Sequence, residues 1–166
     1  MTEGVLPDEL NELASRVVAQ NIAAGRTIAL AESCTGGLVA AAITEIPGSS
    51  EVLDRGFVTY SNESKMEALD VAQDIIETFG AVSIACVWAM AQGALAKSNA
   101  DVAIAISGVA GPGGGTDLKP VGTVVFARAI RNSDGEPEGE LKHFGGKSRA
   151  EIRHQATVCA LELLLP

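Results

Sequence analysis

The chain has 166 residues, of which 47% are hydrophobic, 20% charged and only 4% aromatic. This length suits one domain with its own core, and we expect a single domain over residues 1–166. The composition excludes a disordered chain, a collagen-like repeat and a coiled coil. The net charge of −9 argues against nucleic acid and anionic membranes as partners, because clustered Lys and Arg bind both. It leaves room for a small anionic ligand in a local basic pocket.

Nothing in the sequence indicates export or a membrane. No apolar run reaches the ~18 residues that a membrane span needs. The N-terminus is acidic and lacks the basic and then apolar stretches of a signal peptide. The 3 cysteines are widely spaced and form no CxxC or Cys/His zinc pattern. We therefore expect a soluble cytoplasmic protein with reduced thiols.

In the first half of the chain, helical patterns alternate with two short apolar runs. An amphipathic pattern predicts a helix over residues 7–22, and an apolar run over 27–31 predicts a buried strand. The Ala-rich segment 38–46 is predicted to be helical until Pro-Gly stops it. A second strand is predicted over 57–60. Two short helices follow over 65–69 and 73–79.

The second half contains longer elements. Ser83 is suited to cap a helix that runs to Lys97. The continuous apolar run 102–106 is typical of a strand buried on both faces, and a further strand is predicted over 121–130. A polar turn and an antiparallel partner strand are then expected over 132–139 and 140–144.

The last helix begins with a capping box formed by Ser148 and Glu151. Strands therefore alternate with helices along the chain, and one hairpin lies near its end. This order predicts an α/β layered domain built on a mostly parallel, mixed sheet that contains one antiparallel strand.

Three polar or glycine-rich segments each follow a predicted strand, over residues 32–37, 60–65 and 107–116. In open α/β sheets, ligands bind beyond the carboxyl ends of the strands. We therefore expect these three segments to meet and to form the functional site.

The first of these segments places Ser33, Cys34 and Thr35 between a strand and a helix. The free N–H groups at the helix N-terminus could stabilise an oxyanion beside a Ser or Cys nucleophile, and Gly36 and Gly37 would allow close approach to the backbone. The alternative is ordinary helix capping by Ser33 or Thr35. The segment lacks the first glycine of the G-x-S-x-G nucleophile elbow.

A serine nucleophile needs a base. The 2 histidines, His143 and His154, do not follow parallel strands, so a Ser-His-Asp triad is weakly supported. Burial can lower the pKa of a lysine enough to make it a base, and Lys65 is the basic residue of the second segment, where Tyr60 also lies. The alternative is that Lys65 is a solvated lysine on a helix face.

The third segment is rich in glycine but matches neither the Walker A loop nor G-x-G-x-x-G, and residues 145–148 also miss the Walker A pattern. A glycine-rich crossover without a ligand remains an alternative. A local basic cluster near the C-terminus could bind an anionic group, or could consist of solvated charges. Its members are Lys142, Lys147, Arg149 and Arg153.

Together, AESCTGG at 31–37, GFVTYSNESK at 56–65 and SGVAGPGGGTDLKPVGTV at 107–124 resemble the CinA C-terminal domain family. The characterised members of that family are nicotinamide-nucleotide amidohydrolases, or nicotinamide mononucleotide deamidases. The resemblance runs along essentially the whole chain. The additional N-terminal domain of larger CinA proteins is absent, so the chain looks like the stand-alone form.

The resemblance implies hydrolysis of the carboxamide of nicotinamide mononucleotide, in pyridine-nucleotide recycling. Ser33 would be the nucleophile and Lys65 the base, with Tyr60 assisting. It also implies a three-layer α/β/α fold, homo-oligomers and no metal or other cofactor. Backbone groups would hold the oxyanion, and a second set would bind the nucleotide. The oxyanion residues are Cys34, Thr35, Gly36 and Gly37, and the binding residues are Ser107, Gly108, Gly111, Thr116 and Arg149.

One departure from the family affects the presumed anion site. Residues 145–149 read Gly-Gly-Lys-Ser-Arg, where many relatives have Gly-Asp-Arg, and this changes the local charge. Two other functions stay open at this stage. Cys34 could be the nucleophile in place of Ser33, or the chain could be a non-catalytic nucleotide-binding or regulatory module linked to competence or DNA damage.

Overall fold

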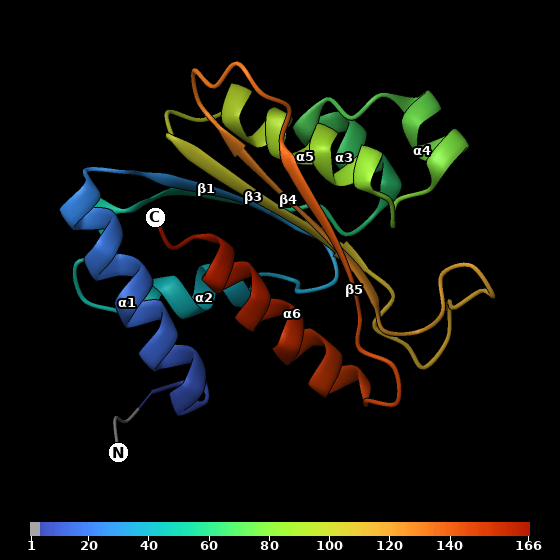
Figure 1. The fold of residues 1–166 in the computed structure, drawn as a ribbon, viewed down its shortest axis with the longest axis horizontal. Coiled ribbons are helices and arrows are strands. Elements are labelled where there is room, and N and C mark those ends of the chain that lie inside the picture. The colour runs from blue at the N-terminus through green and yellow to red at the C-terminus, as the bar shows by residue number, and fades with distance from the viewer. Residues whose placement is uncertain (1–3) are drawn as a thin grey trace.

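The computed structural model describes residues 4–166, and a five-stranded sheet runs through its centre (Figure 1). The strand order is β2-β1-β3-β4-β5. The strands are β1 (Ile28–Glu32), β2 (Leu53–Val58), β3 (Val102–Gly108), β4 (Thr123–Ile130) and β5 (Glu138–His143). β1 pairs in parallel with β2 and β3, whereas β4 pairs antiparallel with β3 and β5. The predicted α/β class with a mixed sheet is confirmed, but its pairings divide evenly between parallel and antiparallel.

Helices cover both faces of this sheet (Figure 1). On one face lie α1 (Asp8–Ala24), α2 (Leu38–Thr44) and α6 (Arg149–Leu163). On the other face α5 (Ile84–Ala96) packs on the strands, and α3 (Asn62–Leu69) and α4 (Gln73–Phe79) pack against α5. A single turn of 3₁₀ helix, Ser49–Glu51, precedes β2. Within residues 4–166, no helix is both long and apolar enough to cross a membrane.

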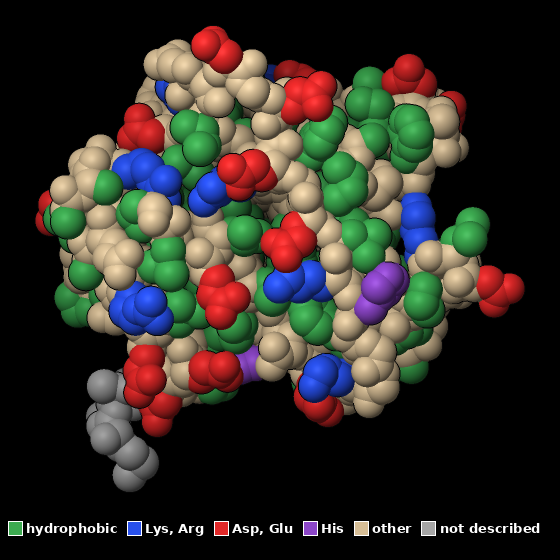
Figure 2. All heavy atoms as spheres, in the orientation of Figure 1, with side chains coloured by type: hydrophobic (Ala, Val, Ile, Leu, Met, Phe, Trp, Pro, Cys, Tyr) green, Lys and Arg blue, Asp and Glu red, His purple; other side chains and the backbone are tan. Residues whose placement is uncertain are grey.

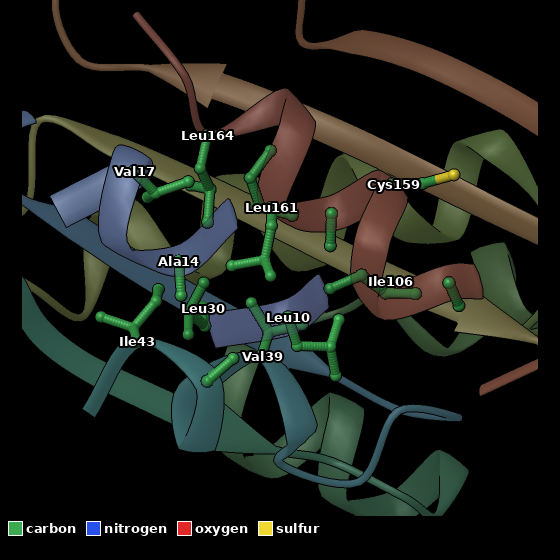
Figure 3. Close-up of a cluster of buried hydrophobic side chains, with 14 of the residues drawn as sticks. Leu10, Ala14, Val17, Leu30, Val39, Ile43, Ile106, Cys159, Leu161 and Leu164 are labelled. Carbon is green, nitrogen blue, oxygen red and sulfur yellow. The ribbon is translucent and has the colours of Figure 1, made fainter. Parts of the chain in front are cut away.

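Two hydrophobic cores result, because successive residues of a strand point to opposite faces. Leu30 and Ile106 face α1 and α6, where Leu10 and Leu161 close over them (Figure 3). The opposite face of β1 and β3 carries small side chains, and these allow α5 to lie close to the sheet. They are Ala29, Ala31, Ala103 and Ala105. The central strands therefore consist of continuous apolar runs, as the sequence predicted.

The second strand differs most from its prediction. β2 spans Leu53–Val58, whereas the sequence pattern indicated 57–60, so Tyr60 lies beyond the strand. The reason is that β2 is an edge strand with mostly exposed residues, and its LDRG segment shows no apolar alternation. The helix after it also begins earlier, at Asn62, because Ser61 caps it in a capping box with Ser64. The predicted caps at Ser83 and Ser148 are confirmed.

Candidate active site

The three segments that follow strands meet at one end of the sheet, as predicted. They line a cleft of about 320 Å³. Its lining residues include Ser33, Cys34, Tyr60, Asn62, Lys65, Ser107, Gly108, Gly111 and Arg149. Larger surface hollows lie against α1, but neither contains a nucleophile paired with a base. We therefore place the candidate active site in the smaller cleft.

A serine and a lysine are directly bonded in this cleft. The amine Nζ of Lys65 lies 2.9 Å from Oγ of Ser33 and 2.8 Å from the carbonyl oxygen of Thr59. Lys65 is only 1% exposed, and this burial lowers the pKa of its amine. A neutral amine has two N–H groups and one lone pair, so it can donate to Thr59 and still accept the Ser33 proton. This geometry is that of a nucleophile beside its general base.

The fold brings Lys65 to this position through α3. The backbone N–H of Thr59 donates to the carbonyl oxygen of Glu32, which ties the segment after β2 to the end of β1. Lys65 lies on the buried side of α3 with Leu69. A Cβ at Gly93 of α5 would lie 2.0 Å from the carbonyl oxygen of Leu69. Glycine is therefore required there for α3 to lie this close to α5.

Residues 32–37, which we call the nucleophile turn, are held by a dense set of hydrogen bonds. The N–H of Ser33 donates to Ile106 on β3, and the N–H of Gly36 donates back to the Ser33 carbonyl. The carboxylate of Glu32, which is 1% exposed, accepts three N–H groups at the start of α2. These belong to Gly37, Val39 and Ala40. A carboxylate at a helix N-terminus is also favoured by the helix dipole.

This bonding pattern narrows the set of possible oxyanion donors. The N–H groups of Gly36 and Gly37 are already engaged within the turn. Among the backbone–backbone hydrogen bonds of residues 4–166, none is donated by the N–H of Cys34 or of Thr35. These are the two N–H groups that directly follow Ser33, the usual place for an oxyanion donor.

The Cys34 thiol beside the nucleophile is buried. Burial raises its pKa to about 12, so the thiol stays protonated at neutral pH. Because the thiolate is the reactive form of cysteine, this environment disfavours Cys34 as a nucleophile and leaves Ser33 as the better candidate.

Tyr60 and Arg149 form a second polar group at the mouth of the cleft. One Nη of Arg149 donates to the Tyr60 hydroxyl at 2.9 Å, and the other donates to the carbonyl oxygen of Gly111 at 2.7 Å. Arg149 thereby links the start of α6 to two of the three converging segments. The Tyr60 side chain is 59% exposed, and its recorded hydrogen bond is to Arg149 rather than to Ser33 or Lys65.

The loop that joins β3 and β4 forms the other wall of the cleft and projects from the end of the sheet (Figure 1). Ser107, Gly108 and Gly111 line the cleft as predicted, and so do Gly113 and Gly114. Thr116 is not among the lining residues. Its hydroxyl accepts the N–H of Lys119, and its own N–H donates to the Lys119 carbonyl.

The two histidines lie outside the site. His154 pairs with Glu9 on α1, and His143 contacts Thr123. Members of the predicted basic cluster have separate partners, because Arg149 donates to Gly111 and Tyr60 whereas Arg153 donates to the backbone of the nucleophile turn. Figure 2 shows basic and acidic side chains interspersed on the face that it draws. Lys142, for example, pairs with Glu140. Among residues 4–166, no group of three or more His, Cys, Asp or Glu side chains could hold a metal ion.

Several site residues were not predicted from the sequence. Glu32 was assigned to a polar segment without a role, although a carboxylate just before a helix is a signal for N-terminal capping. Asn62 lay in the predicted segment 60–65 but was given no role, and the Thr59 carbonyl had no signal in the sequence. The guanidinium of Arg153 donates to the carbonyl oxygens of Cys34 and Thr35, a contact between residues more than a hundred positions apart.

An α/β sheet with a buried Ser–Lys pair at its carboxyl end defines the class of this protein as a candidate serine hydrolase. Comparison with known proteins then gives the family. The CinA C-terminal domain family matches residues 10–166, and the chain belongs to this family.

Relatives of two kinds are similar to the chain. It is 48% identical over 156 residues to the nicotinamide-nucleotide amidohydrolase PncC of Escherichia coli K12, and the match covers 94% of this chain and 93% of that protein. It is 47% identical over 152 residues to a CinA-like protein of Syntrophotalea carbinolica, and this match covers 92% of this chain and 36% of that protein. The chain thus spans little more than a third of the length of the longer curated relatives.

The fold agrees with that of a solved structure. The crystal structure of the competence/damage inducible protein CihA from Agrobacterium tumefaciens has a TM-score of 0.92 and 46% sequence identity to this chain, and the match covers 96% of both chains.

Proposed function

We propose that this protein hydrolyses the exocyclic carboxamide of nicotinamide mononucleotide to give nicotinic acid mononucleotide and ammonia. The observation that carries the proposal is the bond between the buried Lys65 amine and Ser33 Oγ in the cleft. The similarity to a nicotinamide-nucleotide amidohydrolase over 94% of the chain supports the choice of substrate.

The first half of the proposed reaction forms an acyl-enzyme. Lys65 accepts the hydroxyl proton as Ser33 Oγ attacks the amide carbon, and the carbonyl electron pair moves onto oxygen. The N–H groups of Cys34 and Thr35 stabilise this oxyanion. When the C–N bond breaks, the Lys65 ammonium gives its proton to the leaving nitrogen, and ammonia departs.

The second half uses the same groups in reverse roles. Lys65, now neutral, takes a proton from water, whose oxygen attacks the ester carbon. The new oxyanion collapses, the bond to Ser33 Oγ breaks, and Lys65 returns the proton to Ser33. The acid product and the free enzyme result. No step requires a metal or an organic cofactor.

Binding of the nucleotide is assigned to the opposite side of the cleft. Arg149 provides a guanidinium for the phosphate, since Arg forms bidentate hydrogen bonds with phosphate oxygens. Tyr60 assists by orienting Arg149. The backbone of Ser107, Gly108 and Gly111 lines the space left for the ribose and the ring. Thr116 is left out of this assignment because it bonds within its own turn.

The proposal keeps the setting that the family resemblance implied, namely a homo-oligomer that recycles pyridine nucleotides in the cytoplasm. The three free, buried cysteines fit a reducing compartment. Size-exclusion chromatography with light scattering would test the oligomeric state.

The decisive experiment measures ammonia and nicotinic acid mononucleotide after incubation with nicotinamide mononucleotide. We expect the Ser33→Ala and Lys65→Met variants to lose at least ~10³-fold in kcat, as removal of a nucleophile or its base does. The Cys34→Ala variant should keep most of the activity. Substrate binding without turnover by the folded wild-type protein would contradict the proposal and favour a non-catalytic nucleotide-binding module.

A further inference from the structure

Arg153 contacts the nucleophile turn from outside the cleft. It lies on the first turns of α6, is half-buried, and is not among the residues that line the cleft. Its Nε donates to the carbonyl oxygen of Cys34 at 3.0 Å, and one Nη donates to the carbonyl oxygen of Thr35 at 3.2 Å. The proposed reaction leaves this guanidinium without a role, although it binds the backbone beside Ser33.

The position of these two carbonyls matters because each peptide unit is planar. The Cys34 carbonyl and the Thr35 N–H belong to one peptide plane, so a bond to the first fixes the direction of the second. In the same way, the Ser33 carbonyl shares its plane with the Cys34 N–H, and it accepts the N–H of Gly36. The direction of the Cys34 N–H and that of the Thr35 N–H are thus each fixed by a hydrogen bond to the carbonyl oxygen of the same peptide unit.

A cation on a peptide carbonyl also polarises that peptide and makes its N–H a stronger donor. The glycine at position 36 leaves room for the Arg153 guanidinium beside the turn. Gly36 has a left-handed φ of +58°, and a Cβ there would lie 3.2 Å from Nη2 of Arg153. A side chain at Gly36 would therefore press on the guanidinium as well as strain the backbone.

We propose that Arg153 is a positioning residue that orients and polarises the Cys34–Thr35 peptide, so that the Thr35 N–H stabilises the oxyanion formed at Ser33. This inference rests on the proposed role of Ser33 as nucleophile. Arg153 acts through the backbone and does not touch the substrate.

The variant that tests this role is Arg153→Lys, which keeps the charge but lacks the planar fork of N–H donors that holds both carbonyls in a fixed direction. We expect kcat for nicotinamide mononucleotide to fall about 10- to 100-fold while KM changes less than about twofold, because the lost interaction acts in the transition state. The matched control is Arg131→Lys. Arg131 also clamps carbonyls, those of Leu95, Ser98 and Ala100, but at the opposite end of the sheet. The Arg131→Lys substitution should lower the melting temperature while leaving kcat unchanged.

A second readout does not depend on the natural substrate. A fluorophosphonate probe reacts when Ser33 Oγ forms a bond to phosphorus, the P–F bond breaks, and Lys65 takes the hydroxyl proton as fluoride leaves. The phosphoryl oxygen then needs the same N–H donors. We expect Arg153→Lys to slow this labelling by about the same factor as kcat, and Arg131→Lys to leave it unchanged.

The outcomes separate the two proposals. If wild-type protein is labelled at Ser33 but releases no ammonia, the substrate assignment fails and the role of Arg153 is still measured by the probe. Equal labelling rates in Arg153→Lys and wild type, or no labelling of wild-type Ser33, would overturn the inference. Should Arg153→Lys fold poorly, Arg153→Ala provides a further test. Added guanidinium ion should restore part of its labelling rate and methylammonium should not, and no recovery would count against the role.

Discussion

The two segments that form the walls of the cleft are built in opposite ways. The nucleophile turn is buried at Ser33, Cys34 and Thr35, and Glu32 and Arg153 bond its backbone on either side. The glycine-rich loop, residues 108–120, is exposed from 112 to 118. Its recorded backbone bonds lie mostly near its ends, at Val109 and at the turn between Thr116 and Lys119.

This difference indicates that the two segments have separate functions in the reaction. Groups that stabilise a transition state must be held in place before the reaction, because reorganisation at that moment would raise the barrier. Groups that enclose a substrate can instead adjust as it binds. On this view the turn determines kcat, and the glycine-rich loop with Arg149 determines KM. Substitutions in each wall of the cleft test that separation.

The largest effect is expected from the pH dependence of the Ser33–Lys65 pair. Only neutral Lys65 can accept the serine proton, so kcat/KM should rise about tenfold per pH unit until Lys65 loses its proton. Burial lowers the pKa of Lys65, so the midpoint should lie below the ordinary ~10.4. A midpoint at or above that value would contradict the role of Lys65 as base.

The lowered pKa of Lys65 also predicts how the stability of the protein changes with pH. Between the lowered pKa of folded Lys65 and the ordinary pKa of the unfolded chain, the unfolded state binds more protons. The free energy of unfolding should therefore rise with pH across that window, and the Lys65 contribution should be constant below it. Denaturant unfolding of wild type and Lys65→Met at several pH values measures the difference. Identical slopes would show that Lys65 is not the group responsible.

Glu32→Gln is expected to weaken the turn itself. The carboxylate accepts three backbone N–H groups in a buried site, whereas an amide offers one acceptor oxygen and turns an NH₂ group toward the remaining donors. We expect a loss of about 2–3 kcal/mol in the free energy of unfolding, within the range for buried bonds to charged groups. Activity should fall mainly through kcat. A fall confined to KM would contradict the division between turn and loop.

Arg149→Ala should have the complementary effect. It removes the guanidinium from the cleft and releases Gly111 and Tyr60 without touching Ser33 or Lys65. We expect KM to rise about 10- to 30-fold, as for the loss of one charged contact to a phosphate, with kcat within about threefold. Steady-state kinetics with nicotinamide mononucleotide measure both. Nicotinamide riboside, which lacks the phosphate, should be unaffected by the change.

The contrast between turn and loop also explains what could be predicted from the sequence. Ser33 and Lys65 follow strands, and strand order alone brings such segments to one edge, so their convergence was predictable. Arg153 was predicted only as a member of a basic cluster. Its contact with the nucleophile turn was not predictable, because its partners lie 119 and 118 positions away and only the packing of α6 on the sheet places it there. Thr116 was grouped with the cleft but is not among its lining residues, since glycine content does not indicate which way a loop faces. β2 was misplaced because an edge strand lacks the apolar pattern of a buried one.

The smallest effects are expected from a matched pair of glycine substitutions, one in each segment. Gly36→Ala places a side chain at a left-handed φ of +58° and 3.2 Å from the Arg153 guanidinium. It should cost about 1–2 kcal/mol in the free energy of unfolding and also lower kcat. A Cβ at Gly113 meets no atom within 4 Å, so Gly113→Ala should change stability by less than about 0.5 kcal/mol and affect only KM. If Gly113→Ala lowered kcat as much as Gly36→Ala, the glycine-rich loop would share in the chemistry, and the two walls of the cleft would have to be treated as one preorganised unit.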